Sequence, residues 1–165
     1  MVVKKSETVE KSVKTSEKVI EKSLEIKVKY HDKDLGKIEK LPIGDWLDLR
    51  SAERVDMNAG EYRNISLGVS MKLPAGYEAH VVPRSSTFRR WGILLTNGVG
   101  IIDESYCGED DVWTFPALAM RSTTIFKGDR ICQFRIVKKM SEVTFKEVNK
   151  MTNPNRGGLG STGRG

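Results

Sequence analysis

The sequence predicts an all-β fold, a compact sandwich or barrel of short strands. Apolar and polar residues alternate in several short runs, and turn-forming glycines, prolines and asparagines separate these runs. No long stretch shows the three-to-four-residue apolar spacing of an amphipathic helix. With 165 residues, the chain has the length of a single domain, since domains average about 100–200 residues.

The first 23 residues form a charged segment that is distinct from the rest of the chain. They are rich in Ser, Lys and Glu and contain no aromatic residue, which is typical of a disordered or thinly helical tail. From Leu24 the pattern has a period of two. Leu24, Ile26, Val28 and Tyr30 alternate with polar residues, which predicts a half-buried strand over 24–30.

The remaining elements follow from the same signals. The alternation of residues 66–73 predicts a strand, which the turn Pro74-Ala75-Gly76 separates from a strand over 78–82 that ends at Pro83. Ser86 to Trp91 is the one candidate helical turn. Further strands are expected at 93–96, 99–102, 111–115, 117–120, 131–137 and 143–148, with a tight hairpin at Asn97-Gly98. The domain therefore covers 24–152, and 153–165 is a glycine-rich arm.

Charge and composition limit the function. The chain has 28 Lys and Arg against 22 Asp and Glu, a net charge of +6. Because the basic residues are scattered among acidic ones, nucleic-acid binding is unlikely and a small polyanionic ligand is favoured. No apolar run reaches the ~18 residues of a membrane span, and no secretory signal is present. Two cysteines and two histidines make a poor zinc site. A cytoplasmic protein is expected, with no membrane partner.

Two segments are candidate phosphate sites. Arg84, Ser85 and Ser86 follow the strand that ends at Pro83, where a guanidinium fork and hydroxyl groups can hold phosphate oxygens. The second segment, Arg156 to Gly163, combines four glycines with Ser and Thr, so that backbone N–H groups can surround an anion. The alternatives are an ordinary polar turn and a terminus without fixed structure.

Residues 97–106 combine groups that suit a nucleoside. Gly98 and Gly100 let the backbone approach a flat base closely, and Asn97 adds a side-chain amide. Asp103 follows two isoleucines, where a carboxylate can orient a water and accept its proton. Tyr106 can offer its ring to a sugar. The alternative is a hairpin with a solvated acidic turn.

The strand at 131–137 places Cys132, Phe134 and Ile136 on one face. Gln133 then lies on the opposite face, where its amide can hold a water or a ligand. Cys132 is expected to be a small core residue, because nothing near it in the sequence would lower the pKa of its thiol. Cys107 lies in a turn and is expected to be exposed; neither thiol is a catalytic candidate.

Taken in order, five segments resemble the motifs of the trimeric all-β dUTP pyrophosphatases (dUTPases), and the resemblance covers residues 24–165. The segments are Asp45–Ala52, Pro83–Ser86, Gly100–Tyr106, Gly128–Gln133 and Arg156–Gly163. The resemblance implies jelly-roll-like subunits that form a homotrimer. It also implies active sites that draw motifs from all three chains, with the C-terminal arm reaching over a neighbouring subunit.

The resemblance implies Mg²⁺-dependent hydrolysis of dUTP to dUMP and pyrophosphate, which limits uracil incorporation into DNA and supplies dUMP for dTMP synthesis. By position, Asp103 would activate the attacking water and Gln133 would help to place it. Tyr106 would pack under the deoxyribose. Uracil would be read by Asn97 and by the backbone from Gly98 to Ile102, including Gly100.

The remaining implied roles concern the phosphates and the metal. Arg84, Ser85 and Ser86 would hold phosphates, and Asp48 would lie near Mg²⁺ through a water, supported by Arg130. In the arm, the residues that would close on the phosphates are Arg156, Gly160, Ser161 and Thr162.

This sequence departs from the family pattern at Leu159, where a phenylalanine usually stacks on the uracil. Trp91 is the first candidate for an aromatic lid in its place and Phe88 the second; Trp91 could equally be a core or trimer-interface residue. At Cys107 most relatives carry a basic residue.

Two functional alternatives remain: a dCTP deaminase, which shares the fold, and a phage-type dUTPase that also binds a repressor protein.

Overall fold

The computed structural model describes residues 23–155 and 157–158, and within them the fold is all-β, as predicted. One short helix, α1 (Thr87–Trp91), lies at the predicted helical turn. The strands are β1 (Lys27–Tyr30), β2 (Leu47–Arg50), β3 (Val55–Met57), β4 (Tyr62–Ser66), β5 (Val69–Lys72), β6 (Tyr77–Pro83), β7 (Ile93–Leu95), β8 (Gly100–Ile102), β9 (Thr114–Ala119), β10 (Thr123–Ile125) and β11 (Arg130–Lys138).

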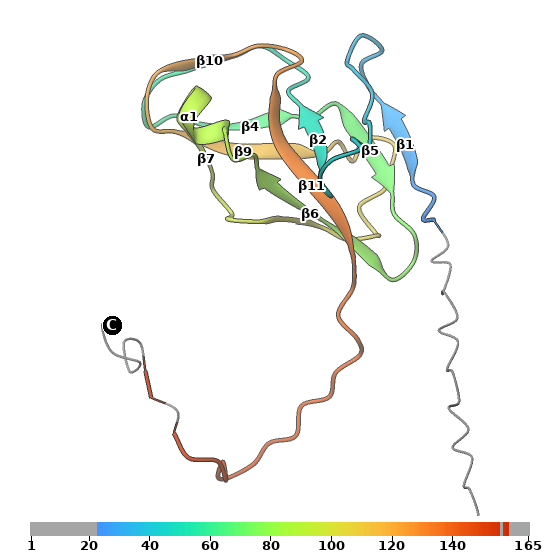
Figure 1. Ribbon diagram of the computed structural model, residues 1–165, viewed down its shortest axis with the longest axis vertical. Coiled ribbons are helices and arrows are strands. Elements are labelled where there is room, and N and C mark those ends of the chain that lie inside the picture. Colours follow the sequence, from blue (N-terminus) through green and yellow to red (C-terminus); the bar gives the residue numbers. More distant parts are fainter. Residues whose placement is uncertain (1–22, 156, 159–165) are drawn as a thin grey trace, which may run out of the picture.

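In the described part of the chain, all strand pairs are antiparallel and form four small sheets (Figure 1). The largest has the order β2-β11-β6-β8, and a second has the order β4-β9-β7. The pairs β1-β5 and β10-β3 complete the fold. Strand β11 is central to the largest sheet: its Gln133 lies opposite Asp48 of β2 on one side and Val82 of β6 on the other. This register brings together residues that are far apart in the sequence.

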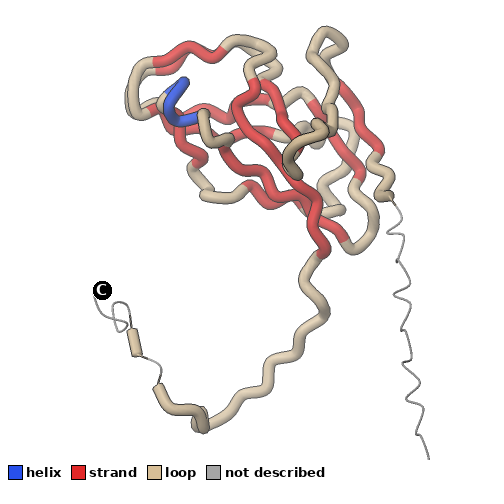
Figure 2. The backbone as a smooth tube through the Cα atoms, in the orientation of Figure 1, coloured by secondary structure: helices blue, strands red, loops and turns tan. Residues whose placement is uncertain are grey.

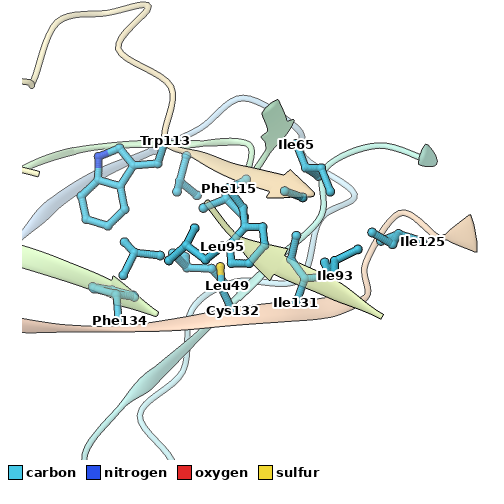
Figure 3. Close-up of a cluster of buried hydrophobic side chains, with 14 of the residues drawn as sticks. Leu49, Ile65, Ile93, Leu95, Trp113, Phe115, Ile125, Ile131, Cys132 and Phe134 are labelled. Atoms are coloured by element: carbon cyan, nitrogen blue, oxygen red, sulfur yellow. The ribbon is translucent and has the colours of Figure 1, made fainter. Parts of the chain in front are cut away.

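The core lies between the sheets (Figure 3). Its largest fully buried side chains include Trp113, Phe115 and Phe134, and the rings of Trp113 and Phe134 meet edge to face with centroids 5.4 Å apart. Burial of each large apolar side chain contributes about 1.5–3 kcal/mol, so these residues hold the sheets together. Cys132 is fully buried among them, as expected, and burial raises the pKa of its thiol.

Two predicted strands have different boundaries in the structure. The first strand begins at Lys27 rather than Leu24, which is exposed. The strand predicted over 66–73 is interrupted at Gly68, whose φ of +65° is left-handed. A Cβ atom there would lie 2.8 Å from the Cβ of Ala52, so only glycine fits. One alternating run therefore belongs to two strands, β4 and β5.

The predicted strands 111–115 and 117–120 are a single strand, β9, which runs through Pro116. Pro116 pairs opposite Asn64 of β4, and its carbonyl accepts a hydrogen bond from the backbone N–H of Thr96. The predicted hairpin at Asn97-Gly98 is also wrong, because β7 pairs with β9 whereas β8 pairs with β6. The turn at Gly98 (φ +69°) instead carries the chain from one sheet to the other.

The strand predicted over 143–148 does not form. These residues are exposed, and Phe145 is 96% exposed. After β11 the chain leaves the body of strands and runs alongside no other strand (Figures 1 and 2). An alternating segment needs a neighbour to pair with, and the described part of the chain supplies none.

The predicted tail falls almost entirely on residues 1–22, and most of the arm falls on residues 156 and 159–165, which lie outside the described residues. Within the described part, the single helix has five residues and cannot cross a membrane.

Candidate functional site

A cavity of about 290 Å³ lies beside β8, close in size to small ligand sites of roughly 300–1,000 Å³. Five of the predicted nucleoside-site residues line it: Asn97, Gly100, Ile102, Asp103 and Tyr106. Its apolar wall comes from residues that the sequence did not single out: Val81, Leu95, Val112, Trp113 and Pro116. The structure therefore brings one predicted group of site residues together.

Strand pairing shapes this cavity. Gly100 lies opposite Val81 of β6, and a Cβ atom at Gly100 would be 3.3 Å from the Val81 Cβ, so glycine lets the two strands approach closely. Alternation along β8 leaves Ile101 exposed and half-buries Ile102. Since Gly100 has no side chain, its peptide groups are accessible at this part of the cavity wall.

The carboxylate of Asp103 is exposed at the cavity and is held by Ser105. Its Oδ1 accepts hydrogen bonds from the Ser105 backbone N–H at 2.7 Å and from the Ser105 hydroxyl at 2.5 Å. These bonds, the hydroxyl bond first, hold the pKa of Asp103 below its ordinary value. Asp103 thus presents an oriented, ionised carboxylate at the cavity. Sequence reasoning missed Ser105, although a serine two residues after an aspartate is a known local hydrogen-bonding pattern.

Tyr106 keeps its ring accessible: the residue is 42% exposed, and its hydroxyl donates to the Val112 carbonyl at 3.4 Å. Asn97 is exposed at the turn that precedes β8. Both side chains can therefore meet a ligand without leaving the positions they have in the structure.

A second group of predicted residues forms an ion-pair cluster that we call the arginine cluster: Asp48, Arg84 and Arg130. The Arg84 Nε lies 2.7 Å from Asp48 Oδ1, and the Arg130 Nη1 lies 3.1 Å from Asp48 Oδ2. Arg84 also donates to the Arg130 carbonyl at 3.2 Å. Asp48 and Arg84 are mostly buried, with side chains 18% and 23% exposed, so water screens this pair less than a surface pair.

The loop after β6 positions the arginine cluster. The Arg84 backbone N–H donates to the hydroxyl of Thr87 at 2.9 Å, and this fully buried hydroxyl donates to the Ile131 carbonyl at 2.8 Å. Thr87 thus fixes the phosphate-loop candidate to β11, a role that sequence reasoning missed. Ser85 is exposed and Ser86 half-buried just before α1. The amide of Gln133 donates to the Pro83 carbonyl at 3.4 Å.

The two lid candidates differ in burial. Trp91 is 7% exposed and packs in the core, whereas Phe88, on the same helix, is 51% exposed. Of these two candidates, Phe88 is the one with an exposed ring. Cys107 is half-buried rather than exposed, and both cysteines are free thiols.

Asp48 suits a water-mediated metal contact, since each of its oxygens already accepts from an arginine. Among residues 23–155 and 157–158, no three His, Cys, Asp or Glu side chains gather as a metal-binding cluster. Mg²⁺ commonly keeps several waters and binds one or two carboxylates together with substrate phosphates. The residues present fit a magnesium ion that arrives with a phosphorylated substrate.

Within the described residues, no hydrogen bond or ion pair links Asp103 to the arginine cluster. The contacts of the described residues thus form two groups, one at the cavity and one at the junction of β2, β6 and β11.

Comparison with known proteins identifies the fold and the family. The protein-family model described as dUTPase matches residues 46–163. The SPbeta prophage-derived deoxyuridine 5'-triphosphate nucleotidohydrolase of Bacillus subtilis is 56% identical over 140 residues, which cover 85% of this chain and 99% of that protein. The corresponding enzyme of Streptomyces avermitilis is 38% identical and covers 70% of this chain and 67% of its own length.

Solved structures agree on the fold. A dUTPase of Staphylococcus bacteriophage 80alpha, solved with dUpNHpp, matches with a TM-score of 0.70 and 21% identity, over 86% of this chain and 99% of that one. The dUTPase of Streptococcus mutans matches with a TM-score of 0.64 and 23% identity, over 72% of this chain and 98% of that one.

Proposed function

The chain belongs to the dUTPase family and hydrolyses dUTP, and from this we propose that the cavity beside β8 binds the deoxyuridine half of the substrate. The observation that carries the proposal is the meeting of Asn97, Gly100, Ile102, Asp103 and Tyr106 in one cavity. The backbone of β8 and the Asn97 amide read uracil, because fixed donors and acceptors leave the amino group of cytosine unpaired. Tyr106 packs under the deoxyribose and leaves no room for a 2′-hydroxyl.

The triphosphate half binds the arginine cluster and the hydroxyls beside it. Its roughly four negative charges repel an attacking water until positive groups offset them. Arg84 supplies a half-buried guanidinium, and Ser85 and Ser86 supply hydroxyl donors at the start of α1. In the arm, Arg156, Gly160, Ser161 and Thr162 close over the β and γ phosphates; these residues lie outside the described part of the chain.

Hydrolysis then needs one proton acceptor. Asp103 accepts a proton from a water that Gln133 helps to place, and the water oxygen attacks the α-phosphorus. The bond from the α-phosphorus to the bridging oxygen breaks, so that dUMP and pyrophosphate leave. The low pKa of Asp103 keeps it ionised at neutral pH.

The reaction uses Mg²⁺, with Asp48 in contact through a water. The ion supplies charge neutralisation and polarises phosphate oxygens when bound. Arg130 and Arg84 hold the carboxylate of Asp48 in place, where it would accept a hydrogen bond from a water bound to the ion.

The active protein is a homotrimer, and each of its active sites combines residues from more than one copy of the chain. The contacts of the described residues support this to the extent that Asp103 makes no direct hydrogen bond or ion pair with the arginine cluster, so the two groups are able to serve different sites. The chain beyond β11, which leaves the body of strands (Figure 1), supports an arm over residues 153–165 that reaches a neighbouring subunit. Since Leu159 cannot stack on uracil as an aromatic ring does, we assign the lid to Phe88, whose ring is exposed, in preference to Trp91.

The proposal is tested by pyrophosphate release from dUTP, UTP, dTTP and dCTP, each with and without Mg²⁺. We expect release from dUTP alone, and strongly only with Mg²⁺. Ammonia from dCTP without pyrophosphate from dUTP would indicate a deaminase. Equal turnover of UTP and dUTP would contradict the role of Tyr106.

A further inference from the structure

Strand β11 contains a β-bulge beside the arginine cluster. Its pairing with β2 shifts register between Arg130 and Cys132, so that Ile131 has no opposite residue in β2. The pairing of β11 with β6 begins only at Cys132. A bulge of this kind bends its strand and redirects the side chains next to it. Here it follows directly after Arg130, one of the two arginines of the arginine cluster.

The hydroxyl of Thr87 reaches the backbone of this bulge. Ile131 is fully buried in the core (Figure 3), and its carbonyl accepts a hydrogen bond from the Thr87 hydroxyl at 2.8 Å. Thr87 is fully buried as well. Because a buried carbonyl without a partner is costly, this hydrogen bond stabilises the bulge in the position it has in the structure.

The same hydroxyl holds the backbone of Arg84. It accepts a hydrogen bond from the Arg84 N–H at 2.9 Å, and the Thr87 N–H donates in return to the Arg84 carbonyl at 3.0 Å. These two bonds close the turn that carries Ser85 and Ser86. A threonine hydroxyl can donate one hydrogen bond while it accepts another, and here it does both. One buried hydroxyl therefore joins the turn after β6 to the bulge of β11.

The two segments that Thr87 joins carry the two arginines of the arginine cluster. The Nη1 of Arg84 donates to the carbonyl of Arg130, and its Nε contacts Asp48. A guanidinium has five N–H groups, so these two contacts leave others for a phosphate. The direction of those remaining donors depends on where the Arg84 backbone lies, and the Thr87 hydroxyl fixes that place.

Resting on the proposed function, we propose that Thr87 is a positioning residue for phosphate binding. Without touching the substrate, its hydroxyl fixes Arg84 relative to the bulge of β11, so that the remaining guanidinium donors meet the triphosphate. A displacement of about 1 Å in such a group can cost about a hundredfold in rate, so the fixed place of Arg84 is part of the site's function.

The test compares two substitutions of Thr87. Thr87→Val keeps the shape of the side chain and removes both hydrogen bonds of the hydroxyl, whereas Thr87→Ser keeps the hydroxyl. The ligands are dUpNHpp, the compound present in the phage 80alpha structure, and deoxyuridine, which has no phosphate. Both are titrated calorimetrically with Mg²⁺ present. Thr124→Val is the matched control, since it removes a threonine hydroxyl that donates to Asp56, outside the cavity and the arginine cluster.

In Thr87→Val, we expect the affinity for dUpNHpp to fall about tenfold or more, because the guanidinium is displaced from the phosphates. The affinity for deoxyuridine should stay near that of the wild type. Thr87→Ser and Thr124→Val should bind both ligands as the wild type does. A wild-type affinity of Thr87→Val for dUpNHpp, or an equal loss of affinity for both ligands, overturns the proposal.

A double-mutant cycle separates positioning from a general loss of stability. Thr87→Val should lower the Tm in any background, because it leaves buried backbone groups without their partner. In the Arg84→Gln background it should not weaken dUpNHpp binding further, since the residue that Thr87 positions is already gone. A further loss in that background as large as the loss in the wild type contradicts a role through Arg84.

Arg84→Gln alone shows whether this inference or the proposed function has failed. If Arg84→Gln weakens dUpNHpp binding and Thr87→Val does not, Thr87 positions nothing and the proposed function stands. If Arg84→Gln leaves the affinity unchanged, the phosphate role of Arg84 is wrong and this inference fails with it.

Hydrogen exchange of the wild-type protein keeps the proposal testable if Thr87→Val does not fold. The Arg84 N–H, which donates to the buried Thr87 hydroxyl, should exchange slowly with water, as the amides of the central strands do. Fast exchange of this N–H would mean that Thr87 does not hold the Arg84 backbone, and would overturn the proposal.

Discussion

The cavity beside β8 and the arginine cluster hold their functional groups in different ways. In the cavity, the one charged group, Asp103, is exposed and is held by its neighbour Ser105, two residues along the chain. In the arginine cluster, charges from three separate strands or loops meet, and Asp48 lies half-buried between Arg84 and Arg130. The charged group of the cavity is thus held by a contact within its own loop, whereas the arginine cluster is held by contacts between residues far apart in the sequence.

This difference separates catalysis from stability. Asp103 makes its contacts with its own loop, so its charge can change without disturbing the sheets. Asp48 joins β2 to the loop after β6 and to β11, so its removal leaves two guanidinium groups without their partner. Substitution of Asp103 should therefore lower turnover without lowering stability, whereas substitution of Asp48 should also lower stability.

Asp103→Asn should show the largest effect on activity. The amide keeps the shape of the side chain but cannot accept the proton, so turnover should fall by about 10²–10⁴-fold. Binding of dUTP and the Tm should stay near those of the wild type, because the side chain is exposed. Single-turnover kinetics and calorimetric titration check this result, and near-normal turnover contradicts the role of Asp103.

Asp48→Ala should reduce both stability and activity. Two guanidinium charges lose their partner at a mostly buried position, which costs about 1–3 kcal/mol, less than for a fully buried pair. The Tm should fall by several degrees, and turnover at low Mg²⁺ should fall more than turnover at high Mg²⁺. Asp45→Ala is the control, since the contacts of Asp45 with Lys40 and Arg135 are exposed. An unchanged Tm in Asp48→Ala would remove the distinction between the two regions.

Tyr106→Ala should act on specificity. Without the ring there is room for a 2′-hydroxyl, so the preference for dUTP over UTP in kcat/KM should fall by about tenfold or more. The control is Tyr62→Ala, because Tyr62 is 51% exposed on β4 and does not line the cavity. If both variants keep the wild-type preference, Tyr106 does not contact the sugar.

Ser105→Ala should give the smallest effect, a shift in pH dependence. The Ser105 hydroxyl is the main cause of the low pKa of Asp103. A low pKa keeps the carboxylate ionised as the pH falls, so the wild type should stay active to a lower pH than an ordinary aspartate allows. Losing the hydroxyl raises the pKa, and the acid limb of kcat/KM should move to higher pH. A shift in the opposite direction rejects this assignment.

Much of the fold was predictable because the alternation of apolar and polar residues indicates which side chains of a strand are buried. The face shared by Cys132, Phe134 and Ile136 and the strand over 78–82 follow from period-two patterns. Strands such as β3 and β10, with three residues each, are too short to show a pattern. The joining of two predicted strands through Pro116 and the break at Gly68 depend on neighbouring strands, which a local pattern does not contain.

The candidate site was predictable where several residues with functional side chains lie close together in the sequence. Asn97, Gly100, Ile102, Asp103 and Tyr106 come from one short segment and line one cavity. The ion pair between Arg84 and Asp48 was not predicted, because it joins segments far apart in the sequence. Thr87 was missed because it resembles an ordinary polar-turn residue in sequence. Its role comes from a hydrogen bond to the Ile131 carbonyl, which only the folded chain shows.

In the active homotrimer, we expect the cavity of one copy of the chain to act together with the arginine cluster of another copy. This expectation is tested most directly by mixing two variants that are each inactive, Asp103→Asn and Arg84→Gln, after unfolding and refolding them together. If sites are shared between copies, random trimers restore about a quarter of the sites, since half of the cavities and half of the clusters are intact and combine independently. Each variant refolded alone stays inactive. If the mixture regains no activity while forming trimers, both halves of each site come from one chain, and the account is contradicted.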